Sequence, residues 1–289
     1  MTRNRATAFG FVAVLLWSLL ALLTVGSSPV PPLMLNTICF GIGGVLGLVW
    51  TWLTGNLPLL KTVPLRVYFF GTLGLFGYHA LYFSALRLAP AAEAGLIAYL
   101  WPLLIVIFSG FLPGESVRRG HMLGALIGFL GAGLIISGGG SGFHTNDLPG
   151  YVLALICALT WSAYSVLSRK IGTVPTHSVA IFCLASAALS LPLHLVFETT
   201  IWPSTGVQIT SAVLLGLGPV GLAFYVWDIG VKRGDIQLLG TASYAAPLLS
   251  TLILVVAGVA APSWSLLAAA VLITGGALIA ARASLAASG

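Results

Sequence analysis

Apolar stretches long enough to cross a membrane follow one another along almost the whole chain, separated by short turns. A membrane-spanning helix needs about 20 predominantly apolar residues. The turns carry Pro, Gly, Ser and Asn, as in Ser27-Ser28-Pro29 and Gly55-Asn56. The pattern predicts ten spans, at residues 7–26, 33–53, 66–88, 91–111, 119–138, 149–168, 177–197, 208–231, 236–258 and 262–281. The predicted fold class is therefore all-α integral membrane, with no soluble domain in the connections.

The first apolar stretch begins like a secretory signal. Arg3 and Arg5 precede an apolar run from Ala6 to Gly26. This run is too long for an ordinary signal peptide, and no small-x-small cleavage site follows it. We therefore predict that it is the first membrane span and stays in the chain.

Composition supports a membrane protein and excludes several other classes. Of 289 residues, 58% are hydrophobic and 6% are charged, whereas soluble domains carry about 25% charged residues. So few charged residues exclude a water-soluble enzyme, a nucleic-acid-binding protein and a disordered chain.

The distribution of positive charge predicts the orientation in the membrane. With the N-terminus in the cytoplasm and ten alternating spans, eleven of the twelve Lys and Arg residues lie inside, and only Arg87 lies outside. Cytoplasmic loops carry an excess of Lys and Arg. We therefore predict a multi-pass protein of the cell membrane with both termini in the cytoplasm.

Two halves of the chain match each other at a nearly constant offset. A shift of 144 or 145 residues superposes Trp17-Ser18 on Trp161-Ser162, Pro31 on Pro175, Cys39 on Cys183, Tyr99 on Tyr244 and Pro102 on Pro247. The chain is thus predicted to hold two five-helix halves, residues 1–140 and 141–289. Because five is odd, the second half enters the membrane upside down, as in secondary transporters whose site lies between the repeats at the midplane.

These features together resemble the EamA-type drug/metabolite transporter superfamily. The resemblance rests on Trp-Ser in the first span of each half and on a proline in the middle of the fourth. The segments Gly95–Pro102 and Ser243–Pro247 resemble those of YddG-type aromatic amino acid exporters within this superfamily. The resemblance covers the whole chain and implies a ten-helix exporter of aromatic and other apolar amino acids.

Aromatic residues near the centres of the spans mark a candidate site. Trp and Tyr normally lie at the membrane interfaces, and a buried Tyr or Trp needs a partner for its polar atom. Such residues either pack between helices or line a water-filled cavity. They all come from four spans and the corresponding spans of the other half, and this clustering favours a cavity. The predicted substrate-binding residues are Trp17, Tyr78, His79, Tyr82, Tyr99, Trp101, Trp161, Tyr164, Phe224, Trp227, Ser243 and Tyr244.

The fifth and tenth spans have a different character. Apart from Trp264 at the start of the tenth, Phe129 is the single aromatic residue in the two, and Gly120, Gly124 and Gly128 form a stripe of small residues in the fifth. Such stripes allow helices to approach closely. We predict that these two spans are scaffold and do not line the cavity.

Two prolines and one carboxylate complete the candidate set. Pro102 and Pro247 lie in mid-span, where each removes a backbone hydrogen bond; they are static kinks or, as their paired occurrence favours, hinges. Intramembrane ionisable groups are functional candidates. Asp228 is therefore either a proton-carrying site or the partner of Lys232 or Arg233.

The sequence predicts no metal site and no cofactor. Cys39, Cys157 and Cys183 lie in apolar runs without a partner or metal-ligand spacing. Common hydrolase, zinc and phosphate-binding motifs are absent. The predicted partners are a small-molecule substrate and the lipid bilayer, with no nucleic acid; a monomer is compatible with the sequence, which leaves the oligomeric state open.

The absence of charge at the midplane narrows the substrate. A phosphorylated solute would have no basic partner there, and a proton-coupled cation extruder with a first-span carboxylate is disfavoured. A zwitterion with an apolar side chain fits, its ring stacking on Trp and Tyr and its carboxylate accepting bonds from Ser, Tyr or His.

Two alternatives stay open. One is a transporter of the same fold for another neutral metabolite or an organic cation. The more remote one is a membrane-embedded enzyme acting on a lipid. Because His79 is the only ionisable residue near the midplane, we expect transport down the gradient of the solute itself.

Overall fold

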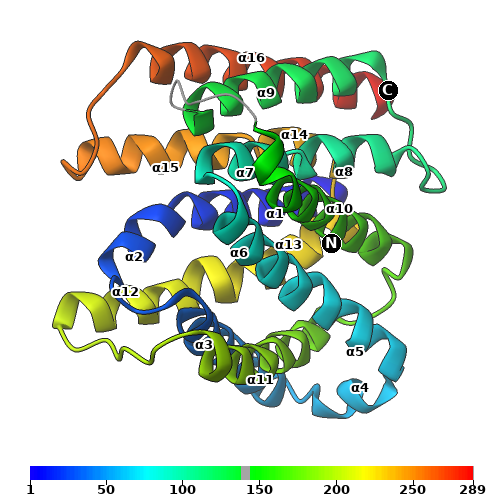
Figure 1. The fold of residues 1–289 in the computed structure, drawn as a ribbon. Helices are drawn as coiled ribbons and strands as arrows, with labels where there is room; N and C mark the ends of the chain where they lie inside the picture. Colours follow the sequence, from blue (N-terminus) through cyan, green and yellow to red (C-terminus); the bar gives the residue numbers. More distant parts are fainter. Residues whose placement is uncertain (138–143, 289) are drawn as a thin grey trace.

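The structure is a computed structural model that describes residues 1–137 and 144–288, and all regular structure in these ranges is helical (Figure 1). The first half comprises α1 (Arg3–Ser18), α2 (Leu20–Gly26), α3 (Pro32–Leu53), α4 (Leu57–Thr62), α5 (Leu65–Thr72), the π-helix η1 (Leu73–Gly77), α6 (Tyr78–Leu88), α7 (Ala91–Ala98), α8 (Trp101–Ser109) and α9 (Arg119–Ser137). The predicted boundary at residues 140 and 141 lies outside the described residues.

The second half has a similar order of elements. It comprises the 3-10 helix η2 (Thr145–Asp147), α10 (Leu148–Lys170), the 3-10 helix η3 (Thr176–Ser178), α11 (Val179–Phe197), α12 (Gly206–Leu217), the π-helix η4 (Gly218–Leu222), α13 (Ala223–Arg233), α14 (Ile236–Ala242), α15 (Ala245–Val256) and α16 (Trp264–Ser288).

Nine segments of the described chain are long and apolar enough to cross a membrane. They are Arg3–Gly26, Pro32–Leu53, Ala91–Ser109, Arg119–Ser137, Thr145–Lys170, Thr176–Phe197, Gly206–Arg233, Ile236–Val256 and Trp264–Ala286. The predicted third span, 66–88, is helical throughout but is not among these nine. Tyr78, His79 and Tyr82 lie in it, so the polar aromatic residues that suggested a site also lower its hydropathy.

The helices pack in pairs that each join one half of the chain to the other. Figure 1 shows α9 beside α16 at one edge of the molecule and α3 beside α11 at the opposite edge. Between these edges, α1 packs against α13 and α10 packs against α6. This arrangement leaves α1, α6, α8, α10 and α15 around the centre, where their side chains meet.

Four of the long helical segments are interrupted near their middles. The segment 91–109 breaks at Tyr99 and Leu100, before Pro102, and the segment 236–256 breaks at Ser243 and Tyr244, before Pro247. Proline has no N–H and its ring clashes with the carbonyl four residues earlier, so a proline inside a helix kinks or breaks it. The π-helices η1 and η4 interrupt two further segments, and π-bulges often occur at functional sites.

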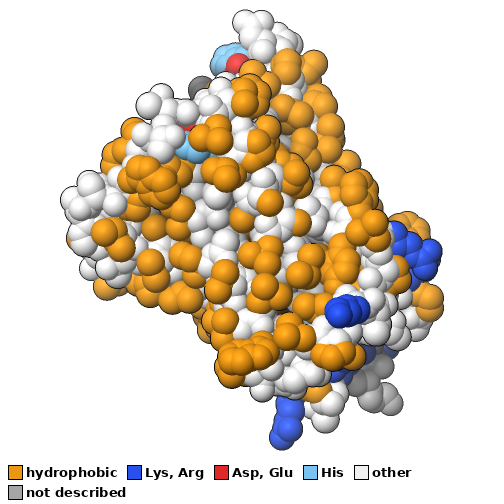
Figure 2. Space-filling model, turned by 90° about the horizontal axis from the view of Figure 1, so that it is seen from below, with side chains coloured by type: hydrophobic (Ala, Val, Ile, Leu, Met, Phe, Trp, Pro, Cys, Tyr) orange, Lys and Arg blue, Asp and Glu red, His pale blue; other side chains and the backbone are white. Residues whose placement is uncertain are grey.

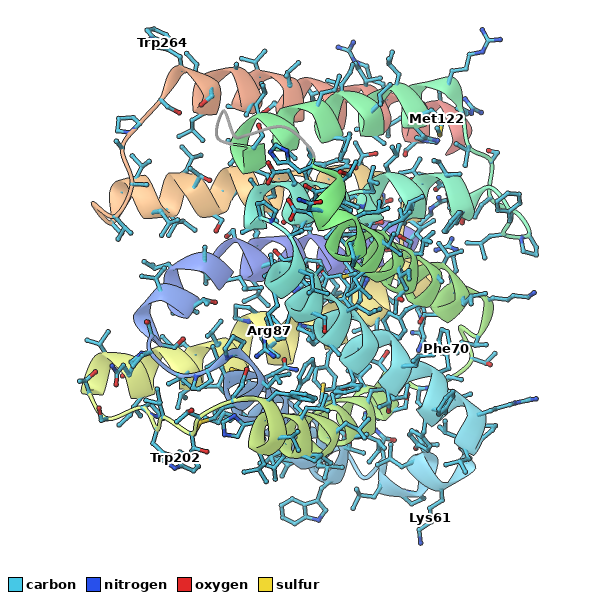
Figure 3. The ribbon with its side chains drawn as sticks, viewed as in Figure 1. Lys61, Phe70, Arg87, Met122, Trp202 and Trp264 are labelled. Carbon is cyan, nitrogen blue, oxygen red and sulfur yellow. The ribbon has the colours of Figure 1, made fainter. Side chains whose placement is uncertain are left out.

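The two ends of the molecule differ in charge. Figure 2 shows a face that is largely hydrophobic, with its Lys and Arg side chains toward the right. In Figure 3, Lys61 lies at this right-hand end, whereas Trp202 and Trp264 lie at the left-hand end. Trp202 is 68% exposed and Trp264 is 86% exposed, as expected for aromatic anchors at a membrane interface.

Candidate substrate-binding cavity

A cavity of about 980 Å³ occupies the centre of the helix bundle. Its walls come from α1, α2, α3, α6, α8, α10, α12, η4, α13 and α15, and from Tyr99 at the break between α7 and α8. It reaches the connection between α2 and α3 at Ser27–Pro31 and extends along α15 to Leu254. Nine predicted site or hinge residues line it: Trp17, Tyr78, His79, Tyr82, Tyr99, Trp101, Trp161, Phe224 and Pro247.

The lining is aromatic and carries no formal charge. Among the described residues that line the cavity, there is no Lys, Arg, Asp or Glu. Neither α9 nor α16 contributes a lining residue, in agreement with the scaffold role predicted for the fifth and tenth spans. A cavity of this size and character is typical of small-molecule sites.

Four indole rings from four helices pack together at the floor of this cavity; three of them line it, and the fourth lies behind them. They belong to Trp17 of α1, Trp101 of α8, Trp161 of α10 and Trp227 of α13. The ring centroids of every pair lie 5.0–6.4 Å apart. The contacts are mostly edge-to-face, which is the favoured geometry of aromatic pairs. We call these four residues the indole cluster.

The side wall of the cavity is a second group of rings, mostly on α6. Tyr78 and Tyr82, one helical turn apart, stack with centroids 6.2 Å apart and planes at 7°. Tyr78 also contacts Trp161 at 5.4 Å. His79 packs edge-on against Phe40 at 5.0 Å, and its Nδ1 lies 2.7 Å from the carbonyl oxygen of Leu75.

The π-helix η4 holds one member of the indole cluster in place. The indole N–H of Trp17 donates to the carbonyl oxygen of Pro219, 3.1 Å away. This bond joins the first membrane segment of one half to the irregular helix of the other. It thereby satisfies the polar atom of Trp17 within the protein.

Several predicted site residues lie behind the wall and do not face the cavity. Trp227 is fully buried and donates to the Ser165 hydroxyl at 3.1 Å. Tyr164 is 3% exposed and packs against Trp161 and Phe70. Both positions share a helix face with a lining residue but point into the neighbouring helix.

Three further predicted residues, at the two helix breaks, also lie outside the lining. Tyr244 is fully buried, and its hydroxyl accepts the Leu103 N–H at 3.1 Å. Ser243 donates within its own helix to the Leu239 carbonyl at 2.7 Å. Pro102 is buried outside the lining, whereas Pro247 lines the cavity. The repeat mates are therefore not equivalent: Tyr99 faces the cavity and Tyr244 closes the helix break.

The structure shows which groups the Asp228 side chain contacts. Its carboxylate pairs with the Lys232 ammonium at 2.9 Å and accepts the Thr176 hydroxyl at 2.7 Å. Both charged side chains are almost wholly buried, and neither lines the cavity. Asp228 is therefore the partner of Lys232 in an ion pair.

Polar lining residues on α3 and α15 were absent from the predicted set. Asn36 and Cys39 line the cavity from α3, and Ser250 and Thr251 line it from α15. The Asn36 amide donates to the Ser190 hydroxyl at 3.0 Å. An Asn within an apolar run was the available signal for this wall.

A second missed group is a charged cluster beyond the indole cluster. Glu115, in the connection between α8 and α9, pairs with Arg169 at the end of α10 and with Arg3, 3.4 Å away. Glu115 also accepts from the Gln237 amide at 3.1 Å, and Asp235 pairs with Arg3 at 3.4 Å. We call these five residues the Glu115 cluster. It joins α1, α10, α14 and the α8–α9 connection, and none of its members lines the cavity.

Membrane-crossing helices, a central uncharged cavity and broken helices beside it define a polytopic membrane transporter of small solutes. The chain belongs to the EamA-like transporter family, whose model matches residues 4–137 and, again, residues 148–282. The family is one of transporters rather than enzymes.

Similar proteins span nearly the whole chain. The aromatic amino acid exporter YddG of Ancylobacter novellus is 55% identical over 283 residues, which cover 97% of this chain and 98% of that protein. The protein of the same name from Escherichia coli K12 is 26% identical over 299 residues, covering 96% and 97%. A crystal structure with 54% identity superposes with a TM-score of 0.93 and covers 96% of this chain and 97% of that one.

Proposed function

We propose that this protein exports aromatic and other apolar amino acids from the cytoplasm by alternating access. The main support for this proposal is the cavity of about 980 Å³. Its described lining combines aromatic rings with polar atoms and holds no Lys, Arg, Asp or Glu side chain. A zwitterion has no net charge to neutralise, and its ring can stack on the indole and phenol rings of the wall. The YddG relatives, which are named aromatic amino acid exporters, support this substrate class.

The proposed architecture is ten membrane helices in two inverted halves. The two family matches support it, as does the helix order. The π-helices begin at Leu73 and Gly218, and the breaks lie at Tyr99 and Tyr244, so both features recur at the 145-residue offset seen in the sequence. The helical segment 65–88 is then the third span and completes the set of ten, with its polar rings turned toward the cavity.

The proposed orientation puts both termini in the cytoplasm of a cell-membrane protein. The positive charges gathered at one end support it (Figures 2 and 3). In this orientation the cavity faces the outside, because its lining includes the connection between α2 and α3 at the opposite end. The indole cluster and then the Glu115 cluster lie on the closed cytoplasmic side.

Counterflow in proteoliposomes tests the proposed function. Vesicles loaded with unlabelled tryptophan, phenylalanine or tyrosine should accumulate external labelled tryptophan transiently, and vesicles loaded with lysine or glutamate should not. Parallel loading with choline or with a neutral non-amino-acid metabolite tests the two remaining transport alternatives. Exchange supported by choline but not by aromatic amino acids would replace amino acid export with organic cation transport.

A further inference from the structure

The cavity must recognise the charged backbone of an amino acid without any charged side chain of its own. The inference about this recognition rests on the proposed function. Three polar atoms of the lining bear on it, and the hydrogen bonds inside the protein determine whether each one donates or accepts.

The first atom is Nε2 of His79. The Nδ1 atom of the same ring lies 2.7 Å from the Leu75 carbonyl oxygen, which can only accept. Nδ1 therefore carries the proton, and in the neutral ring Nε2 is an acceptor. Because His79 lines the cavity, this acceptor is available to a ligand.

The other two atoms are the indole nitrogens of Trp101 and Trp161. An indole N–H can only donate. The N–H groups of Trp17 and Trp227 are already bonded to Pro219 and Ser165. Within the described chain, Trp101 and Trp161 show no such bond, although their side chains are only 5% and 3% exposed. Neither nitrogen is among the buried polar atoms that lack a partner, and both residues line the cavity, so these N–H groups are placed to serve a ligand there.

These atoms lie around one part of the cavity. His79 and Trp161 both contact the rings of Tyr78 and Phe224, and Trp101 contacts Trp161 with centroids 6.3 Å apart. One acceptor thus lies on α6, and two donors lie on α8 and α10. This separation matches a free amino acid, whose ammonium donates and whose carboxylate accepts.

We propose that His79 Nε2 accepts a hydrogen bond from the substrate's α-ammonium group, while the N–H groups of Trp101 and Trp161 donate to its α-carboxylate. The substrate side chain then lies toward the tyrosine rings. His79 selects for a donor, which is the opposite of the carboxylate-binding role expected from the sequence. Hydrogen bonds to a charged group contribute more than neutral ones, so this arrangement replaces the missing charged side chains.

A matrix of three ligands and four variants tests the assignment. Tryptophan, tryptamine and indole-3-propionate share one ring; the second lacks the carboxylate and the third lacks the ammonium. Each ligand competes with labelled tryptophan for the purified protein in detergent. Failure of the wild type to bind tryptophan would remove the proposed function itself, and it is thereby distinguished from failure of this assignment.

We expect His79→Leu to weaken tryptophan and tryptamine about tenfold or more and to leave indole-3-propionate unchanged. His79→Gln, whose amide oxygen restores an acceptor, should recover part of the loss. Trp101→Phe and Trp161→Phe keep a ring without its N–H; each should weaken tryptophan and indole-3-propionate but not tryptamine.

The matched control is Trp227→Phe, because its N–H is already bonded to Ser165. It should shift all three affinities alike. Folded yield is measured by size-exclusion chromatography for each variant. If Trp101→Phe fails to fold, Trp161→Phe alone tests the carboxylate-binding donors. Equal losses for all three ligands in the His79 and Trp161 variants, or no loss in either, would overturn the assignment.

Discussion

The carboxylate of Asp228 and the ammonium of Lys232, one turn apart on α13, form an ion pair at 2.9 Å with 1% and 4% of their side chains exposed. Removing one member of a buried pair leaves an uncompensated charge, whereas removing both is often tolerated. We expect Asp228→Asn to lower stability by about 3 kcal/mol, and Asp228→Asn with Lys232→Met to recover most of it. Thermal unfolding in detergent measures both; a double variant as unstable as the single one would contradict the ion-pair explanation.

The same pair bears on energy coupling. With Asp228 already neutralised and no carboxylate among the described lining residues of the cavity, the site offers no free carboxylate to carry a proton. We expect transport to run down the substrate's own gradient. In proteoliposomes, an imposed pH gradient without a substrate gradient should produce no accumulation; uphill accumulation would make Asp228 or His79 the proton carrier to test.

The sequence predicted the elements better than the directions of their side chains. Depth in a span can be counted from residue numbers, which is why Trp17, Tyr78, Tyr99, Trp101 and Trp161 were found. The face that a residue presents depends on helix breaks. One break turns Tyr244 away from the cavity toward Leu103, while its mate Tyr99 faces the cavity.

Long-range polar contacts were the other feature that the sequence did not predict. Glu115 and Arg169 are far apart in the sequence, and each lies near a predicted loop where a solvated charge is the ordinary expectation. Only the folded chain brings them into one cluster. Asn36, by contrast, lay within an apolar span and could have been noticed.

Close packing of α9 and α16 predicts a difference between two adjacent glycines. A Cβ on Gly276 would lie 2.5 Å from the Gly124 carbonyl oxygen, whereas a Cβ on Gly275 would meet no atom within 4 Å. Gly276→Leu should therefore separate the helices and sharply lower folded yield, and Gly275→Leu should not. Fluorescence-detected size-exclusion chromatography compares them; equal yields would show that this helix contact is dispensable.

The aromatic wall predicts losses of transport that exceed losses of stability. Tyr78→Ala and Trp161→Ala remove rings that line the cavity, whereas Trp52→Ala and Trp264→Ala remove rings that are 64% and 86% exposed. We expect the first pair to lose at least about tenfold in counterflow per folded molecule, since a stacked ring contributes about 1 kcal/mol beyond its buried area. Comparable losses in the exposed pair would place the site elsewhere.

The Glu115 cluster predicts a variant with altered access to the cavity. The carboxylate of Glu115 contacts Arg3, Arg169 and Gln237, which come from three different helices. Those helices must separate at this end before the cavity can open there. Glu115→Gln weakens the charged contacts and should shift the population toward that opening, because alternating access depends on two competing sets of contacts.

Cysteine labelling from the outside measures this shift. Ser250→Cys reports on the cavity wall, and Ser263→Cys, on an exposed connection, serves as the matched control. Both are placed in a background without Cys39, Cys157 and Cys183, which are buried and free. Glu115→Gln should slow labelling at position 250 by an impermeant maleimide and leave position 263 unchanged. Undiminished labelling at position 250 in a well-folded variant would show that these contacts do not hold the cytoplasmic side closed.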